Sequence, residues 1–191
     1  MMKHFLKEVQ AAEDELLVGN VILYPTDTVW GIGCDAENAA AVRKIFKIKE
    51  REESKSMIVL VSNVAMLRRY VRDVPEDFEQ LAESQERPTT FVLSGAQNLP
   101  KELIAEDGSI GMRIAKDEFC HRLMQQIGRP LVSTSANVSG EPSPRNFAEV
   151  SATIKERVDY VVQWRQDEEV ESRPSRIIKI DENGKQTVIR E

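Results

Sequence analysis

The chain has 191 residues, of which 41% are apolar and 30% charged, and its formal net charge is −6 at pH 7. This length and apolar content predict one globular domain over residues 1–191, while the acidic balance argues against a general binder of long nucleic acids. Lys3, His4 and Lys7 interrupt the first residues and no apolar run reaches membrane-spanning length, so we expect a cytoplasmic protein without membrane contact.

The first half of the chain predicts alternating helices and strands. Apolar residues at near-helical spacing predict a helix over residues 5–18, which Gly19-Asn20 ends. Short apolar runs predict buried strands, with helical spacing between them. The predicted elements are a strand at 21–24, a helix at 40–49, a strand at 57–61, and helices at 64–71 and 75–81.

The second half predicts mostly strands. The predicted strands are 89–93, 110–114, 131–134, 159–162, 176–180 and 186–189, with one helix at 119–127. The segment Asp181-Glu-Asn-Gly184 is a hairpin signal that joins the last two strands. This order of strands and helices favours an α/β fold whose sheet is not purely parallel.

Two hydroxyl-rich segments follow predicted strands. They are Tyr24-Pro-Thr-Asp-Thr-Val-Trp-Gly-Ile-Gly-Cys-Asp-Ala36 and Ser133-Thr-Ser-Ala-Asn-Val-Ser-Gly140. Their hydroxyl and amide groups offer donors and acceptors that a core would leave unpaired, and their glycines permit close backbone approach. We therefore predict that both are loops that face one ligand pocket.

Basic residues cluster between residues 41 and 55, where six cations stand against three acidic residues. Lys49, Arg51 and Lys55 lie where the predicted helix gives way to a strand, close to the end of the first hydroxyl-rich loop. A local anion site in an acidic chain suggests a small phosphate ligand. The alternative is a solvated helix end, where cations complement the helix dipole.

Arg113 interrupts an apolar strand pattern, where a charge is costly unless it is paired. Its forked guanidinium binds carboxylates and phosphates through two parallel hydrogen bonds. The sequence leaves two partners open, namely a bound anionic ligand and an internal Asp or Glu.

Other chemistries have weak support. With only His4 and His121 available, a Ser-His-Asp triad and covalent catalysis are not indicated. We interpret Asp27 and Asp35 as turn-forming carboxylates, and the two cysteines lie too far apart for a metal motif. No metal site built from protein side chains is predicted.

Taken together, the motifs resemble those of the YrdC-type threonylcarbamoyl-AMP synthase family in its short, single-domain form. The resemblance spans nearly the whole chain. It rests on the two hydroxyl-rich segments, the second continuing through Glu-Pro-Ser-Pro144, and on Lys49-Glu-Arg51 and Ser109-Ile-Gly-Met-Arg113. It implies a twisted open mixed α/β sheet, flanked by helices, with a concave and positively charged face.

The resemblance implies an L-threonylcarbamoyladenylate synthase, which is a nucleotidyltransferase. Such an enzyme converts L-threonine, bicarbonate or carbon dioxide, and ATP into threonylcarbamoyl-AMP and pyrophosphate, for threonylcarbamoyladenosine modification of tRNA at position 37. Mg²⁺ is expected to accompany ATP, and a threonylcarbamoyl transferase complex is expected downstream.

Site residues follow from matched positions. Threonine would be held by Thr28, Arg113, Ser133 and Ser175. ATP would be held by Arg51, Lys55, Ser109, Ser135, Asn137 and Ser143. Lys49 and Arg51 would supply positive charge to the phosphates as the catalytic residues.

Two alternatives to a free-standing synthase stay open. One is a non-catalytic RNA-binding module that uses the same basic patch, for which a weak RNA or tRNA contact would suffice. The other is a carbamoyl-transfer module that uses carbamoyl phosphate and ATP in metalloenzyme maturation. Modules of that second kind normally sit in longer chains with zinc-finger-like cysteines.

Overall fold

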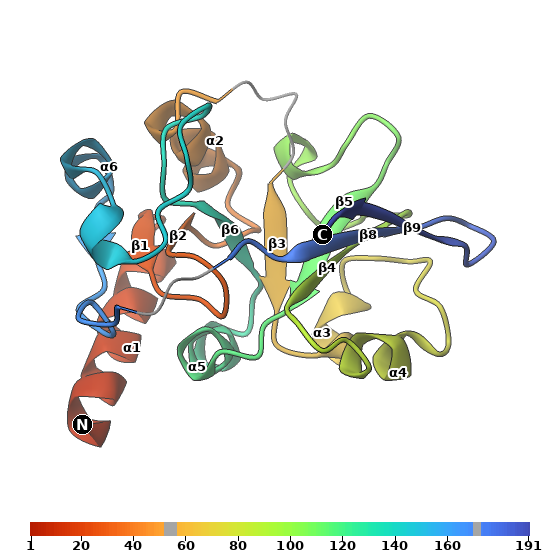
Figure 1. Cartoon of the computed structure of the whole chain (residues 1–191), viewed down its shortest axis with the longest axis horizontal. Coiled ribbons are helices and arrows are strands. Elements are labelled where there is room, and N and C mark those ends of the chain that lie inside the picture. The colour runs from red at the N-terminus through yellow and green to blue at the C-terminus, as the bar shows by residue number, and fades with distance from the viewer. Residues whose placement is uncertain (52–56, 170–172) are drawn as a thin grey trace.

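The computed structural model describes residues 1–51, 57–169 and 173–191. In these residues nine strands form one mixed sheet (Figure 1). They are β1 (Ile22–Tyr24), β2 (Gly31–Gly33), β3 (Ile58–Val61), β4 (Thr89–Leu93), β5 (Ile110–Ile114), β6 (Leu131–Ser135), β7 (Tyr160–Val161), β8 (Arg176–Ile180) and β9 (Gln186–Arg190). Their spatial order is β7-β1-β2-β6-β3-β5-β4-β8-β9.

The sheet combines parallel and antiparallel pairs, which confirms the mixed α/β fold. The pairs β1–β7, β3–β5 and β4–β8 are parallel, and the other five are antiparallel. The predicted hairpin is present, because β8 and β9 pair antiparallel after the Asp181–Gly184 turn.

Helices flank this sheet on both faces. They are α1 (Met2–Leu17), α2 (Ala39–Ile48), α3 (Val64–Leu67), α4 (Phe78–Glu83), α5 (Glu118–Ile127) and α6 (Ala152–Arg157), with 3₁₀ turns at Lys101–Leu103 and Phe147–Glu149. Side-chain caps fix the start of four of them, namely α2, α3, α5 and α6. Asn38 Oδ1 accepts hydrogen bonds from the amides of Ala40 and Ala41 to begin α2, and Asp117 caps α5 through the Cys120 amide.

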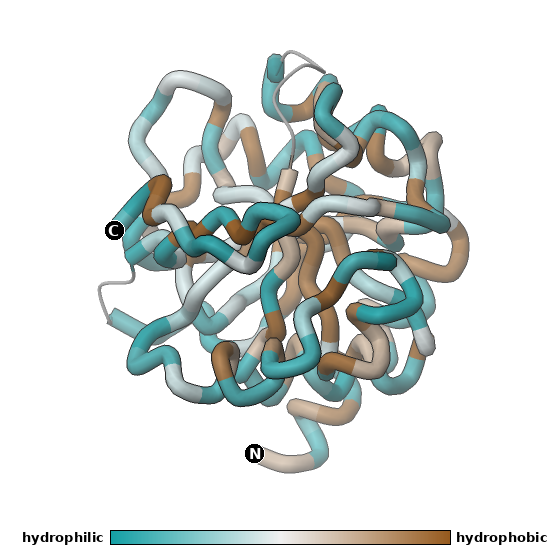
Figure 2. The backbone as a smooth tube through the Cα atoms, turned by 90° about the vertical axis from the view of Figure 1, so that its right-hand side faces the viewer, coloured by the Kyte–Doolittle hydropathy of each residue, from teal (hydrophilic) through white to brown (hydrophobic). Residues whose placement is uncertain are grey.

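The core lies between the sheet and these helices. Figure 2 shows apolar segments running through the middle of the molecule, while hydrophilic segments dominate the outer loops. Tyr24, Phe78 and Phe119 are among the largest fully buried side chains, and Lys49 is buried with them. No helix in the described part of the chain has both the length and the apolar character that a bilayer crossing needs.

Two parts of the element prediction were wrong. Residues 31–33 form β2 inside the first segment that we predicted to be a loop. Gly33 makes that strand possible, since a Cβ there would clash with the Val132 carbonyl and lie 2.6 Å from Tyr24 Cε1. The helix predicted over residues 64–71 ends at Leu67, because Val71 instead bridges to Ala96.

Candidate active site

A pocket of about 210 Å³ opens on one face of the sheet. Both hydroxyl-rich segments contribute to it, as the sequence predicted. Seven predicted site residues line the pocket: Thr28, Arg51, Arg113, Ser133, Ser135, Ser143 and Ser175. Lys49, Ser109 and Asn137 are not among the lining residues, and Lys55 lies outside the described part of the chain.

Strand register brings the pocket side chains together. Ser133 and Ser135 are two residues apart in β6, so both point to the same face of the sheet. Ser133 pairs with Ile58 of β3, and Ser135 pairs with Gly31 of β2. A Cβ at Gly31 would lie 3.3 Å from Ser133 Oγ, so the bare glycine keeps this floor open.

Thr26 fixes the turn that carries Thr28. Its Oγ1 donates to the Val29 carbonyl at 2.8 Å and accepts from the Thr28 amide at 3.0 Å. The two hydroxyl oxygens, Thr26 Oγ1 and Thr28 Oγ1, lie 3.0 Å apart. Both side chains are buried, so Thr28 reaches the pocket on a turn that is already ordered.

Arg113 has the internal partner that the sequence left open. Its guanidinium is 3% exposed, and Nη2 lies 3.1 Å from Asp27 Oδ1. Asp27 is therefore a buried counter-ion, which corrects our interpretation of this residue as a turn-former. The contact lacks hydrogen-bond geometry, and within the described residues Arg113 Nε and Nη2 make no hydrogen bond. These donors can bind an anionic group in the pocket.

Lys49 is not among the residues that line the pocket, so its action on the phosphates stays a prediction. Its Nζ donates to the carbonyls of Ser135 and Asn137, and its own carbonyl accepts from the Ser139 amide at 2.8 Å. The side chain thus fastens the end of α2 to the turn that follows β6. Burial, together with the neighbouring Arg51 charge, lowers the pKa of Lys49 to about 7.

The lowered Lys49 pKa makes stability depend on pH. Below pH 7 the native and unfolded lysine are both protonated, so the full cost of burying the ammonium is present. Above it the native lysine releases its proton, while the unfolded lysine keeps it up to the ordinary value of 10.5. Between about pH 7 and 10.5, we expect the free energy of unfolding of the wild type to rise by about 1.4 kcal/mol per pH unit relative to that of Lys49→Met. Urea unfolding at several pH values measures the difference, and a flat difference would contradict a buried, titrating Lys49.

Ser109 and Asn137 hold local structure. Ser109 Oγ donates to Asp107 Oδ1 at 2.5 Å, and this bond helps to lower the pKa of Asp107 to about 2. Asn137 Nδ2 donates to the carbonyls of Val138 and Glu141 at 3.0 and 2.8 Å, which stiffens the loop leading to Ser143. Our prediction that both side chains contact ATP has no support from their present hydrogen bonds.

The sequence analysis missed Arg190, which lines the same pocket from β9. Its Nε and Nη2 donate to the Ser175 carbonyl at 3.0 and 2.7 Å. Burial, followed by the charges of Arg113 and Arg87, lowers its pKa. In the sequence, the only local feature that could have indicated Arg190 as a site residue is its position as a cation within the last predicted strand pattern. The lining therefore holds three guanidinium groups and, among the described residues, no carboxylate.

Comparisons with known proteins find a family model and similar sequences. The family model Sua5_yciO_yrdC, described as "Telomere recombination", matches residues 14–191. Threonylcarbamoyl-AMP synthase of Pseudoalteromonas translucida is 37% identical over 157 residues, which cover 81% of this chain and 84% of the relative. The same enzyme of Vibrio cholerae is 32% identical over 163 residues, with 84% and 87% covered.

Solved structures share the fold. P. abyssi Sua5 in complex with L-threonine superposes with a TM-score of 0.83 and 25% identity. That match covers 97% of this chain but 54% of the Sua5 chain, so this chain spans about half of its length. E. coli YciO superposes with a TM-score of 0.82 at 23% identity, covering 98% and 89% of the two chains.

Proposed function

Because this chain belongs to the Sua5/YciO/YrdC family, we propose that it is an L-threonylcarbamoyladenylate synthase. The observation that carries the proposal is the pocket itself, where three guanidinium groups and several hydroxyls converge and where none of the described lining residues is a carboxylate. Threonine and ATP together bring a carboxylate and a triphosphate to one place. A pocket of this composition neutralises both anions.

The reaction needs no protein nucleophile. The amine of threonine adds to carbon dioxide, forming an N–C bond and releasing a proton. A carbamate oxygen then attacks the α-phosphorus of ATP, the bond to the bridging oxygen breaks, and pyrophosphate leaves with that electron pair. Such a transfer depends on positioning and on charge neutralisation.

The two substrates occupy different sides of the pocket in this proposal. Arg113 binds the threonine carboxylate, and the hydroxyls of Thr28, Ser133 and Ser175 surround the rest of the amino acid. Arg51 neutralises the phosphates together with the hydroxyls of Ser135 and Ser143, while Arg190, which donates to the Ser175 carbonyl, adds positive charge near Arg113. Lys49 acts indirectly, since it holds the Ser135 and Asn137 carbonyls.

Magnesium enters as part of the MgATP substrate. Mg²⁺ prefers phosphate oxygens and retained waters to cages made of protein groups. The described residues contain no group of three or more His, Cys, Asp or Glu arranged to hold a metal. The expected transferase complex then consumes the labile adenylate product, and bicarbonate or carbon dioxide supplies the carbamoyl carbon.

Pyrophosphate release from ATP tests the proposed activity. The purified chain should release pyrophosphate only when L-threonine and bicarbonate are both present, and L-serine should substitute poorly. Release without threonine would contradict the synthase. ATP-independent, salt-sensitive binding of RNA without any release would favour the non-catalytic RNA-binding module.

Ser175 offers a specific test of the threonine side. Its Oγ lies 2.8 Å from Thr90 Oγ1, and both side chains are buried. We expect Ser175→Ala to raise the KM for threonine about three- to tenfold, the effect of one lost hydrogen bond, with the KM for ATP unchanged. Thr90→Val, which removes only the supporting hydroxyl, is the matched control and should have the smaller effect. A Ser175→Ala change confined to the KM for ATP would place Ser175 on the nucleotide side.

A further inference from the structure

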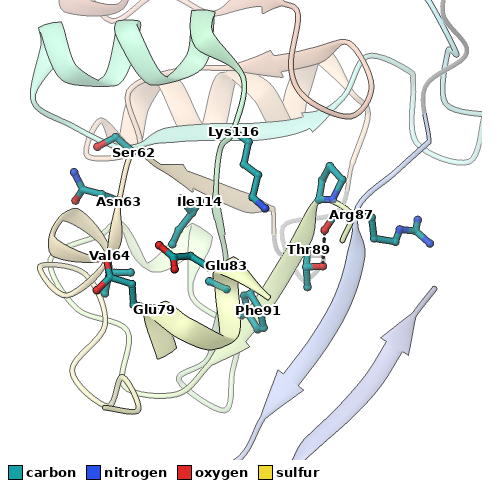
Figure 3. Close-up of a pocket in the computed structure, with 12 residues that line it drawn as sticks. Ser62, Asn63, Val64, Glu79, Glu83, Arg87, Thr89, Phe91, Ile114 and Lys116 are labelled. Carbon is teal, nitrogen blue, oxygen red and sulfur yellow. Dashed lines mark hydrogen bonds between the residues drawn. The ribbon is translucent and has the colours of Figure 1, made fainter. Parts of the chain in front are cut away.

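A second cavity, of about 220 Å³, lies on the opposite face of the sheet from the candidate active site (Figure 3). Side chains alternate along a strand, so neighbouring residues face opposite sides. Arg113 lines the active-site pocket, and Ile114, the next residue of β5, lines the second cavity. In β4, Thr90 contacts Ser175 on the active-site face, whereas Thr89 and Phe91 line the second cavity.

The floor of the second cavity is apolar and preformed. Phe91 and Ile114 come from neighbouring strands, and Val64 comes from α3. Phe91 packs edge-on against Phe78 of α4, with ring centroids 5.0 Å apart. This contact packs α4 against the sheet, so the helix forms a wall beside the floor that the strands make.

Two carboxylates form one wall. Glu79 and Glu83 are one turn apart on α4, and Figure 3 shows both side chains on the cavity side of this helix. Like charges at this spacing destabilise a helix. Within residues 1–51, 57–169 and 173–191, neither glutamate side chain makes a hydrogen bond or an ion pair. The wall is thus complementary to a cation.

The opposite side of the cavity carries positive charge. Lys116, just beyond β5, extends its ammonium group into the cavity from the side away from α4 (Figure 3). Its side-chain hydrogen bond in the described structure goes to the Gln85 carbonyl, at a long 3.4 Å. Arg87, the other cation of the lining, turns away and donates to the Pro174 carbonyl. No ion pair joins Lys116 to Glu79 or Glu83 in this part of the molecule, so charges of opposite sign stand apart across an apolar floor.

We propose that this cavity binds a free apolar amino acid as a zwitterion. The α-ammonium group lies between Glu79 and Glu83, the α-carboxylate lies on Lys116, and the side chain covers Phe91 and Ile114. The volume falls below the roughly 300–1,000 Å³ of sites for drug-sized ligands, which suits a small molecule. A free amino acid carries both charges on one carbon, whereas a peptide separates its two termini.

Titration of the full-length, ¹⁵N-labelled chain with L-leucine, followed by NMR, tests the site. Isopentylamine supplies the same side chain with only the ammonium group, and 4-methylpentanoate supplies it with only the carboxylate. We expect saturable shifts of the Asn63, Glu83 and Lys116 amides with L-leucine, at an affinity at least tenfold above that of either half-ligand. Because these three amides belong to residues that line the second cavity and not the active-site pocket, this result is independent of the synthase proposal.

Variants complete the test. The Glu79→Gln/Glu83→Gln double variant should bind L-leucine at least tenfold more weakly than wild type. Lys116→Met should lower the affinity for L-leucine by a similar factor. Glu76→Gln removes an exposed carboxylate just before α4 that does not line the cavity, so it should bind like wild type. The substituted side chains are exposed, and an otherwise unchanged NMR spectrum verifies folding. Equal binding of isopentylamine, unchanged binding in the double variant, or no saturable shift would each overturn the proposal.

Discussion

Arg51→Ala should lower kcat/KM for pyrophosphate release by about 10²–10³-fold, the typical effect of removing one preorganised charge-stabilising donor. Arg51 is half-buried in the pocket lining, and burial lowers its pKa. A guanidinium held in this setting stabilises negative charge on the phosphates more strongly than a fully solvated cation does. Steady-state kinetics with varied ATP measures the loss.

Two controls separate the local role of Arg51 from a general charge effect. Arg51→Lys keeps the charge but loses the planar fork, so it should recover only part of the activity. Arg43→Ala removes an exposed cation of α2 that pairs with Glu102, away from the pocket, and should leave kcat/KM unchanged. If Arg51→Ala retained wild-type kcat/KM while keeping its melting temperature, Arg51 would not belong to the catalytic machinery.

Arg113→Ala should have a large effect on both stability and threonine binding. Removing the guanidinium leaves the largely buried Asp27 without its counter-ion, and losing one member of a buried pair typically costs about 3–5 kcal/mol. The same change removes the donors that we assign to the threonine carboxylate, so we expect the KM for threonine to rise by about 10- to 150-fold, because a hydrogen bond to a charged group contributes about 1.5–3 kcal/mol. Urea unfolding and threonine titration measure the two effects.

The Arg113→Ala/Asp27→Asn double variant separates the two effects. It removes the orphaned charge, so it should unfold at a higher urea concentration than Arg113→Ala alone. Its threonine KM should stay as high as that of the single variant, because the guanidinium is still missing. A double variant with a normal threonine KM would mean that Arg113 serves only as the structural partner of Asp27.

Apolar periodicity was sufficient to predict most of the fold. β4, β5 and β8 begin and end at the predicted residues, since each is a five-residue segment rich in apolar or β-branched residues. β2 could not be predicted in this way, because Gly-Ile-Gly has one side chain to show a period. Its pairing depends on how closely Gly33 approaches Tyr24 and Val132, which is a property of the assembled sheet.

The candidate site was only partly predictable, because contacts between distant parts of the chain decide where Lys49 and Arg190 lie. Local sequence marked Lys49 as a cation beside Arg51, but it could not show that the Ser135 and Asn137 carbonyls lie within its reach across the sheet. No motif around Arg190 indicates a binding role. It lines the pocket because the final hairpin turns β9 back along β8. Long-range contacts decide both positions, so the spacing of neighbouring residues carries little information about them.

Product identity tests the central claim most directly. The purified chain would be incubated with ATP, Mg²⁺, L-threonine and ¹³C-labelled bicarbonate, and the nucleotides analysed at once by mass spectrometry. The synthase proposal predicts an adenylate that contains threonine and is heavier by the one labelled carbon. The amount of this adenylate should match the amount of pyrophosphate released. Pyrophosphate without that labelled adenylate, or no adenylate at all with folded protein, would contradict it.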